Sequence, residues 1–254
     1  MLAPRVIPCL LLSKAGGVVK TTKFSRPKYI GDPINAVRIF NEKEVDELMI
    51  LDIDASKENR GPDFSLVDQL AGECFMPLCY GGGVRNMSDV KVLFNLGVEK
   101  ICLQSVALRN PKIIREIADR YGEQSVVISI DVKRDWLGRP RLFSHTNIRF
   151  PSNKWHDALL SSVTQGAGEI CLNSVDRDGM RNGMDLALIS EASRLINVPL
   201  IAMGGVGGLY DIKSGIIAGA SAVAAGAYFV FQGKHRAVLI SYPRHEELQN
   251  LWRN

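Results

Sequence analysis

Long hydrophobic runs are missing from this sequence, as are several other features that mark large classes of protein. No run of 18 apolar residues occurs, and the amino-terminal stretch MLAPRVIPCLLL is interrupted by proline and has no cleavage-site pattern. We therefore expect a cytoplasmic chain without a membrane segment. At a net charge of +4, Lys and Arg are scattered rather than gathered in a basic run with interleaved aromatics, so nucleic acid is not an expected partner.

Cysteine and histidine are too sparse and too widely separated to predict a disulfide framework or a metal centre. None of the five cysteines forms a CxxC pair, and Cys9, Cys102 and Cys171 lie in apolar runs, which predicts reduced thiols in the core. His145 begins the stretch HTNIRFPSNKW, His156 follows it, and neither has a second ligand at a metal-binding spacing. We expect neither a metal nor a cofactor.

The sequence does contain an alternation of short apolar runs with longer segments of helical period. The runs predict eight strands, at residues 5–11, 47–52, 76–80, 100–104, 125–131, 169–173, 199–203 and 222–225. Most are continuously apolar, as is typical of strands buried on both faces. In 254 residues this pattern predicts a single α/β domain, residues 1–254, folded as a (β/α)8 TIM barrel. A doubly wound open sheet competes, but it usually has fewer strands and a GxGxxG turn after the first.

The chain also has helical segments between the strands and an internal repeat. Apolar residues at i, i+3, i+4 and i+7 predict outer helices over residues 33–45, 87–97, 110–122 and 186–196. ELMILDIDAS from Glu47 resembles EICLNSVDRDG from Glu169, and YGGGV at 80–84 resembles MGGVG at 203–207. The offsets of 122 and 123 residues are nearly half of the chain and predict two half-barrels, about 1–123 and 124–254.

The duplicated glycine loops follow the third and seventh predicted strands. Glycine allows backbone N–H groups to approach a phosphate closely, and the dipole of the following helix adds to the attraction. Each half could therefore hold one phosphate of a doubly phosphorylated ligand. The alternative is that these glycines serve only to form tight turns.

Several segments together resemble HisF, the cyclase subunit of imidazole glycerol phosphate synthase. They are GDP at 31–33, DELMILDIDAS, YGGGVRN, VVISIDVKR, GAGEICLNSVDRDG and IAMGGVGG, and they extend along nearly the whole chain. The resemblance implies a (β/α)8 barrel that binds a HisH-type glutaminase at its bottom face and passes ammonia through the barrel to the top.

The resemblance also assigns site residues. The ammonia gate of the family corresponds to Arg5, Glu47, Lys100 and Glu169, each at the entry of a predicted strand. Two cations and two anions on the barrel axis can neutralise one another, whereas an unpaired buried charge costs several kcal/mol, about 3 to 5. The alternative is four solvent-facing charges.

The phosphate- and ligand-binding positions of the family are only partly retained. Those implied for this chain are Gly83, Gln104, Ser105, Asp178, Gly179, Gly205 and Gly226. Gln104 replaces an asparagine, while Met203 and Gly226 replace serines, so hydroxyl groups that could hold a ligand are lost.

The decisive departure is in RVIPCLLLSKAGGVVK, the first strand and its loop. The cyclase resembles a two-carboxylate catalyst, with one aspartate ending strand one and another ending strand five. Asp131 ends strand five here, but the position on strand one falls on Leu11 or Leu12. Lys20, on the loop, is the nearest replacement, and it is a cation. Asp131 could also be a carboxylate that only accepts backbone hydrogen bonds.

A HisF-like chain without this aspartate resembles the HisF paralogues of surface-polysaccharide loci, the WbuZ-like proteins. These are thought to supply ammonia from a HisH-like glutaminase to an ATP-dependent amidotransferase that converts an N-acetyl sugar into its acetamidino form. The stretch 145–155, which replaces a glycine- and lysine-rich loop of the cyclase, favours this interpretation. The alternative is an authentic cyclase of histidine biosynthesis that uses a displaced residue and binds a phosphate-bearing substrate.

Overall fold

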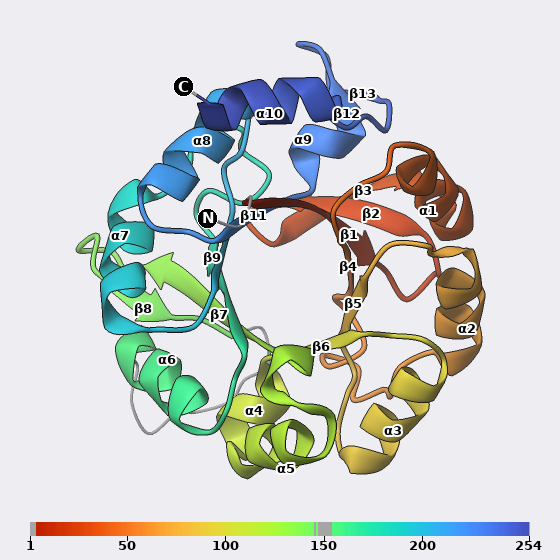
Figure 1. Ribbon diagram of the computed structural model, residues 1–254, viewed down its shortest axis with the longest axis vertical. Helices are drawn as coiled ribbons and strands as arrows, with labels where there is room; N and C mark the ends of the chain where they lie inside the picture. The colour runs from red at the N-terminus through yellow and green to blue at the C-terminus, as the bar shows by residue number, and fades with distance from the viewer. Residues whose placement is uncertain (1–3, 145, 147–153, 254) are drawn as a thin grey trace.

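The barrel predicted from the sequence is confirmed by the computed structural model, which describes residues 4–144, 146 and 154–253 (Figure 1). Its strands are β1 (Arg5–Leu12), β4 (Leu48–Asp52), β5 (Leu78–Gly81), β6 (Lys100–Leu103), β7 (Val126–Arg134), β9 (Glu169–Ser174), β10 (Leu200–Met203) and β11 (Ala222–Ala225). Each pairs in parallel with the next, and β11 pairs with β1 from Arg5↔Ala222 to Pro8↔Ala225. The closed sheet excludes the doubly wound alternative.

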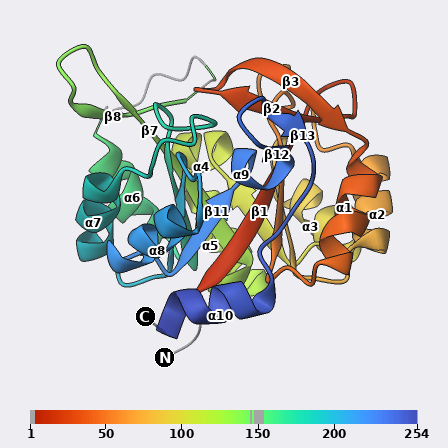
Figure 2. The same cartoon turned by 90° about the horizontal axis from the view of Figure 1, so that it is seen from above.

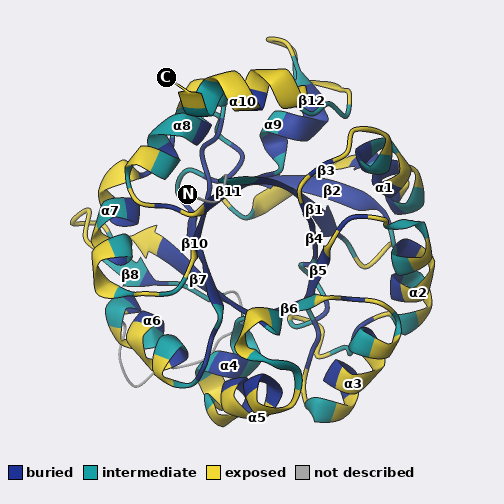
Figure 3. Ribbon diagram, in the orientation of Figure 1, coloured by how far each residue is buried: buried dark blue, intermediate teal, exposed yellow. Residues whose placement is uncertain are grey.

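Helices surround the barrel and cover its outer face (Figures 1 and 3). They are α1 (Pro33–Glu42), α2 (Phe64–Glu73), α3 (Met87–Asn95), α5 (Lys112–Tyr121), α6 (Trp155–Thr164), α7 (Leu186–Leu195), α8 (Leu209–Ile217) and α10 (His245–Arg253), with short α4 (Ser105–Arg109) and α9 (Ala227–Val230) after β6 and β11. The four helices predicted from periodicity are α1, α3, α5 and α7. The division into half-barrels stays a prediction.

Side-chain caps explain where several of these helices begin. Asp32, Asp63 and Asp185 each accept a hydrogen bond from the backbone N–H three residues later, at the starts of α1, α2 and α7. Asn86 accepts two such bonds at the start of α3. These bonds satisfy N–H groups that have no partner within the helix, and they fix the turn between each strand end and its helix.

The core has two layers, one inside the barrel and one between the barrel and the helices. On β1, Ile7, Cys9 and Leu11 belong to the inner layer, whereas Val6, Leu10 and Leu12 belong to the outer layer. This alternation follows from the two-residue period of a strand. Of the three leucines that end β1, only Leu11 therefore contributes to the wall inside the barrel, while Leu10 and Leu12 pack toward the helices.

Short antiparallel strand pairs extend from the upper end of the barrel, where the strands end (Figure 2), and β1 continues into the first of them by pairing with β2 from Leu11↔Val19 to Leu12↔Val18. They pair β2 (Val18–Thr22) with β3 (Ser25–Gly31), β7 with β8 (Pro140–Leu142), and β12 (Phe231–Gln232) with β13 (Ala237–Val238). The first occupies part of what the sequence predicted to be a loop after β1. β1 begins at the opposite, lower end (Figure 2). Among the described residues, no helix has the length and apolarity needed to cross a membrane.

Candidate functional site

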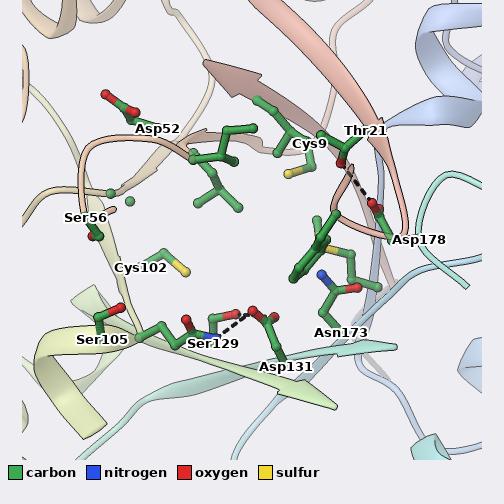
Figure 4. A pocket seen from close by; sticks show the side chains of 18 of the residues that line it. Cys9, Thr21, Asp52, Ser56, Cys102, Ser105, Ser129, Asp131, Asn173 and Asp178 are labelled. Atoms are coloured by element: carbon green, nitrogen blue, oxygen red, sulfur yellow. Dashed lines mark hydrogen bonds between the residues drawn. The ribbon is translucent and has the colours of Figure 1, made fainter. Parts of the chain in front are cut away.

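A pocket of about 150 Å³ opens at the upper end of the barrel, where the strands end (Figure 4). Of the residues predicted for a ligand site, those that line it are Lys20, Gln104, Ser105, Asp131, Asp178 and Gly226. Thr21, Ser56, Lys57 and Thr146 also line it and were not predicted. Ser56 and Lys57 lie only a few residues after Asp52, the last residue of β4. Their polar character so close to a strand end was the signal that could have identified them.

Leu11 faces this pocket from β1. Of the two leucines to which the resemblance assigns the missing aspartate, Leu11 lines the pocket and Leu12 packs in the outer layer. On the neighbouring strand Leu51 pairs with Leu11 and also lines the pocket. This wall of the pocket is therefore apolar.

Asp131 is a buried carboxylate on β7, and the strand, predicted to end at this residue, continues to Arg134. Gln104 Nε2 donates to its Oδ2 at 2.6 Å, and the Ser129 hydroxyl donates to its Oδ1 at 3.2 Å. Burial raises the pKa of Asp131 to about 7, although the hydrogen bonds from Gln104 and Ser129 oppose the change. Near neutral pH this carboxyl group can therefore either donate or accept a proton. Its hydrogen bonds come from side chains, so it is not merely an acceptor for backbone N–H groups.

The raised pKa predicts how stability depends on pH. In the unfolded chain the pKa is near 3.8, so the folded chain retains a proton that the unfolded chain loses, and stability falls between about pH 4 and pH 7. The full difference corresponds to about 4 kcal/mol. We expect Asp131→Asn to be more stable than wild type at pH 8, by up to this amount, with the gain shrinking toward pH 4.5. Urea unfolding at several pH values measures it; a gain independent of pH would contradict the assignment.

Lys20 was predicted on a loop as the nearest replacement for the missing carboxylate, and this placement was wrong. It lies on β2, is buried, and donates from Nζ to Asp178 Oδ1 at 2.7 Å. The Thr21 hydroxyl donates to the other oxygen of Asp178 at 3.2 Å. Lys20 and Asp178 therefore neutralise each other on one side of the pocket.

Of the duplicated loop glycines to which a phosphate-binding role was assigned, Gly83 and Gly205 lie outside the lining of the pocket. Gly82, which does line the pocket, has φ +107°, and a Cβ on it would lie 2.2 Å from the Asp52 carbonyl oxygen. Gly83 and Gly205 have φ +74° and +98°, and a Cβ on Gly205 would lie 2.1 Å from the Gly183 carbonyl oxygen. Gly179, also outside the lining, has φ +70°. Close backbone packing therefore requires glycine here, whether or not a phosphate binds.

Four charged side chains form a ring of ion pairs at the lower end of the barrel. Arg5 Nη1 is 2.5 Å from Glu47 Oε2, and Arg5 Nη2 is 2.9 Å from Glu169 Oε1. Lys100 Nζ lies 2.7 Å from Glu47 Oε2 and 3.2 Å from Glu169 Oε1. Both cations thus contact both anions. The Glu47 Oε1 atom is buried and has no partner among the described residues.

An apolar interior separates the ring from the pocket. On β1 the inward residues above Arg5 are Ile7 and Cys9. The inward residue above Lys100 on β6 is Cys102, and the one above Glu169 on β9 is Cys171. Burial raises the pKa of Cys9 to about 12. A hydrogen bond with Cys79 and burial raise that of Cys102, and burial raises that of Cys171. The thiols are free and remain uncharged.

Comparison with known proteins agrees with this geometry. Residues 5–236 match the family described as "Histidine biosynthesis protein". A protein of Pseudomonas aeruginosa, whose name marks it as a candidate imidazole glycerol phosphate synthase subunit hisF2, is 52% identical over 251 residues, 96% of this chain and 97% of its own. The chain belongs to the HisF family. Similar candidate subunits are HisF of Leptospira interrogans, 48% identical over 99% of this chain and 100% of its own, and hisF3 of Vibrio vulnificus, 46% identical over 97% and 95%.

Most carboxylates that line the pocket of this HisF-family chain are already engaged by other groups of the protein. Of the described residues, the carboxylates that line it are Asp52, Asp131 and Asp178. Asp52 accepts hydrogen bonds from two backbone N–H groups and lies 3.3 Å from Arg60 Nη2, while Asp178 is paired with Lys20. Of these three carboxylates, Asp131 is therefore the one that is not paired with a cation and is suited to proton transfer.

His156 is not part of a cluster of metal-ligating side chains among the described residues. Its Nε2 contacts Glu191 Oε1 at 2.7 Å on the exposed side of α6 and α7. His145 lies outside the described residues. The described part of the chain contains no group of three or more metal-ligating side chains.

Proposed function

We propose that this chain conducts ammonia rather than using it. It receives ammonia from a HisH-type glutaminase and delivers it to a separate ATP-dependent amidotransferase, which converts an N-acetyl sugar of a surface polysaccharide into its acetamidino form. The observation that carries the proposal is the combination of an intact ion-pair ring with a pocket in which Leu11 stands opposite the Asp131 side. These observations support a chain that has the ammonia passage of the family but lacks the acid and base pair required for cyclisation.

The interior favours neutral ammonia over ammonium. A charge taken from water into an apolar environment is strongly disfavoured, whereas a small neutral molecule that can form weak hydrogen bonds is opposed much less. The lining between the ring and the pocket consists of aliphatic side chains and uncharged thiols, among them Met49, Val127 and Cys171. Ammonia that enters when the ring opens would therefore cross without being protonated.

The lower face supports docking of the glutaminase. Phe75, just before β5, is 88% exposed, and Ile217, at the end of α8, is 75% exposed. Phe75 follows α2 and Ile217 ends α8, so both lie near the amino end of the next strand, at the same end of the barrel as the ion-pair ring. Large exposed apolar side chains at the entrance to the passage suit a protein partner.

The upper pocket could still hold a phosphate-bearing molecule. Backbone N–H groups of the glycine loops do not depend on the lost serines, and Ser105 retains a hydroxyl, 3.4 Å from Thr146 Oγ1. Gly226 offers only its backbone N–H on the other side. We therefore propose that phosphate binds weakly and prefers the Ser105 side.

A cyclase is the second candidate function, and the names of the relatives favour it. Each is named as a candidate subunit of imidazole glycerol phosphate synthase. A cyclase would have to use Asp131 together with Asp52 or Asp178, both of which are engaged in other contacts.

Reconstitution with the two partner proteins tests the proposal. With the HisH-type glutaminase, the ATP-dependent amidotransferase and the N-acetyl sugar, we expect glutamine to support amidation only when this chain is present. Ammonium chloride should support it without this chain, because free ammonia bypasses the passage. Mass spectrometry of the sugar measures the product. Equal glutamine-dependent yield without this chain would contradict the proposal.

A further inference from the structure

The tip of the β7–β8 hairpin carries two large apolar side chains that do not pack on the barrel. Trp136 is 88% exposed and Leu137 is 51% exposed, and both lie in the turn between the two strands. A third exposed apolar residue, Leu186, begins α7. We call Trp136, Leu137 and Leu186 the rim patch. An almost fully exposed tryptophan is uncommon on a protein surface, and tryptophan is enriched at interaction sites.

The hairpin tip is ordered by hydrogen bonds of its own. The Asp135 carboxylate accepts from the backbone N–H groups of Leu137 and Arg139 at 3.0 and 2.9 Å, and from the Nε atoms of Arg139 and Arg141 at 2.8 and 3.2 Å. Arg134 Nη1 donates to the Gly138 carbonyl oxygen at 2.9 Å. Trp136 is thus presented by a rigid turn, so little conformational entropy is lost when a partner binds.

The tip is also held in position relative to the barrel. Arg134 Nη2 is 2.8 Å from Asp185 Oδ2, and the Arg134 backbone N–H donates to Asp176 at 2.7 Å. Asp185 caps α7, directly before Leu186 of the rim patch. Figure 2 shows the hairpin rising above α6 and α7 at the upper end of the barrel. The same strand, β7, carries Asp131 into the pocket.

The charge that the tip offers to a partner is positive. Arg139 is 54% exposed, and Arg134 and Arg141 are partly exposed, whereas the carboxylates that they contact, Asp135 and Asp185, are largely covered. A complementary surface would combine an apolar depression with acidic residues around it.

We infer that the rim patch is the docking site for the ammonia-consuming enzyme, a protein that offers an apolar pocket with an acidic border to Trp136. The inference rests on the proposed function, because ammonia that leaves the upper pocket must enter the amidotransferase without passing into bulk water. A partner seated on the hairpin and the start of α7 lies beside the pocket mouth, at the end opposite the expected glutaminase site.

A matched pair of variants tests the inference in direct binding. We expect Trp136→Ala to weaken binding of the purified amidotransferase about 10- to 100-fold, as is typical of a tryptophan at the centre of an interface. Val92→Ala, which changes an exposed residue on α3, should bind as wild type does. Arg139→Gln should weaken binding less and reduce its dependence on salt. Circular dichroism checks that each variant is folded.

The coupled reaction gives the second readout. At limiting amidotransferase, Trp136→Ala should lower the product formed per glutamine hydrolysed, while a large excess of the enzyme should restore it. Wild-type affinity and coupling in a folded Trp136→Ala protein would overturn the docking site and leave the proposed function standing. If wild type itself neither binds the amidotransferase nor supports glutamine-dependent amidation, both fail.

A lipid surface is the competing occupant for a tip with Trp and Arg. Sedimentation with vesicles of phosphatidylglycerol and phosphatidylcholine distinguishes it. We expect wild type to stay in the supernatant. Vesicle binding that is lost in Trp136→Ala, with amidotransferase binding unchanged, would overturn the inference.

Discussion

Purified protein given ammonium chloride and the doubly phosphorylated formimino ribulotide that HisF cyclases convert is expected to form no imidazole glycerol phosphate at a cyclase-like rate. Ring closure needs an acid and a base on opposite sides of the substrate, and removing one of them lowers the rate about 10²- to 10⁴-fold. Leu11 faces the pocket where the second carboxylate would be required. Product is measured by chromatography, with an authentic HisF cyclase as the positive control.

Supplying ammonium salts separates this result from a missing glutaminase. If product does form at near-cyclase rates, the chain is a cyclase that uses a displaced residue, and the conduit proposal fails. The Asp131→Asn protein distinguishes this from contamination, because a genuine reaction in this pocket should become much slower when the buried carboxyl group on β7 is replaced.

Replacing Lys100 by alanine is expected to uncouple the glutaminase from the amidotransferase. Lys100 contacts both Glu47 and Glu169, so its loss leaves Arg5 alone between two buried carboxylates. Removing one member of a buried ion pair costs about 3 to 5 kcal/mol at the upper end. The ring should then open to water, and ammonia should escape or be protonated before it reaches the pocket.

The measurement is product formed per glutamine hydrolysed in the reconstituted system. We expect this ratio to fall for Lys100→Ala and to stay at the wild-type value for Lys91→Ala, which changes an exposed lysine on α3. Circular dichroism and thermal unfolding check that the variant is folded. Unchanged coupling in a folded variant would mean that the four ring residues are only structural, and that ammonia takes another route.

Much of the architecture could be predicted because it depends on local patterns. Strands buried on both faces are apolar along their whole length, and amphipathic segments of helical period must lie outside them. The alternation of eight such strands with helices leaves few alternatives to a closed barrel. The four charges of the ring were assigned through the resemblance to the HisF family, and their position at the entry of apolar strands agreed with that assignment.

The same apolar pattern hides which residues face inward. In a strand whose two faces are both buried, hydrophobicity does not alternate, so nothing in LLL distinguishes Leu11, which faces the pocket, from Leu10 and Leu12, which face the helices. Only closure of the barrel, with Leu11 opposite Leu51 on the next strand, decides it.

Contacts between distant residues were likewise decided by the tertiary structure. Lys20 was expected on a loop, but it lies on β2 and contacts Asp178, which is 158 residues away in the sequence. The rim patch depends on the same kind of arrangement, because Trp136 looks in the sequence like any aromatic residue of a turn. The sequence by itself determined the barrel, the charged residues of the ring and the absence of a second carboxylate on strand one. The tertiary structure decided which side chains meet in the pocket and which remain exposed. The reason is that closure of the barrel brings together residues that are far apart in the sequence, and local patterns contain no information about such contacts.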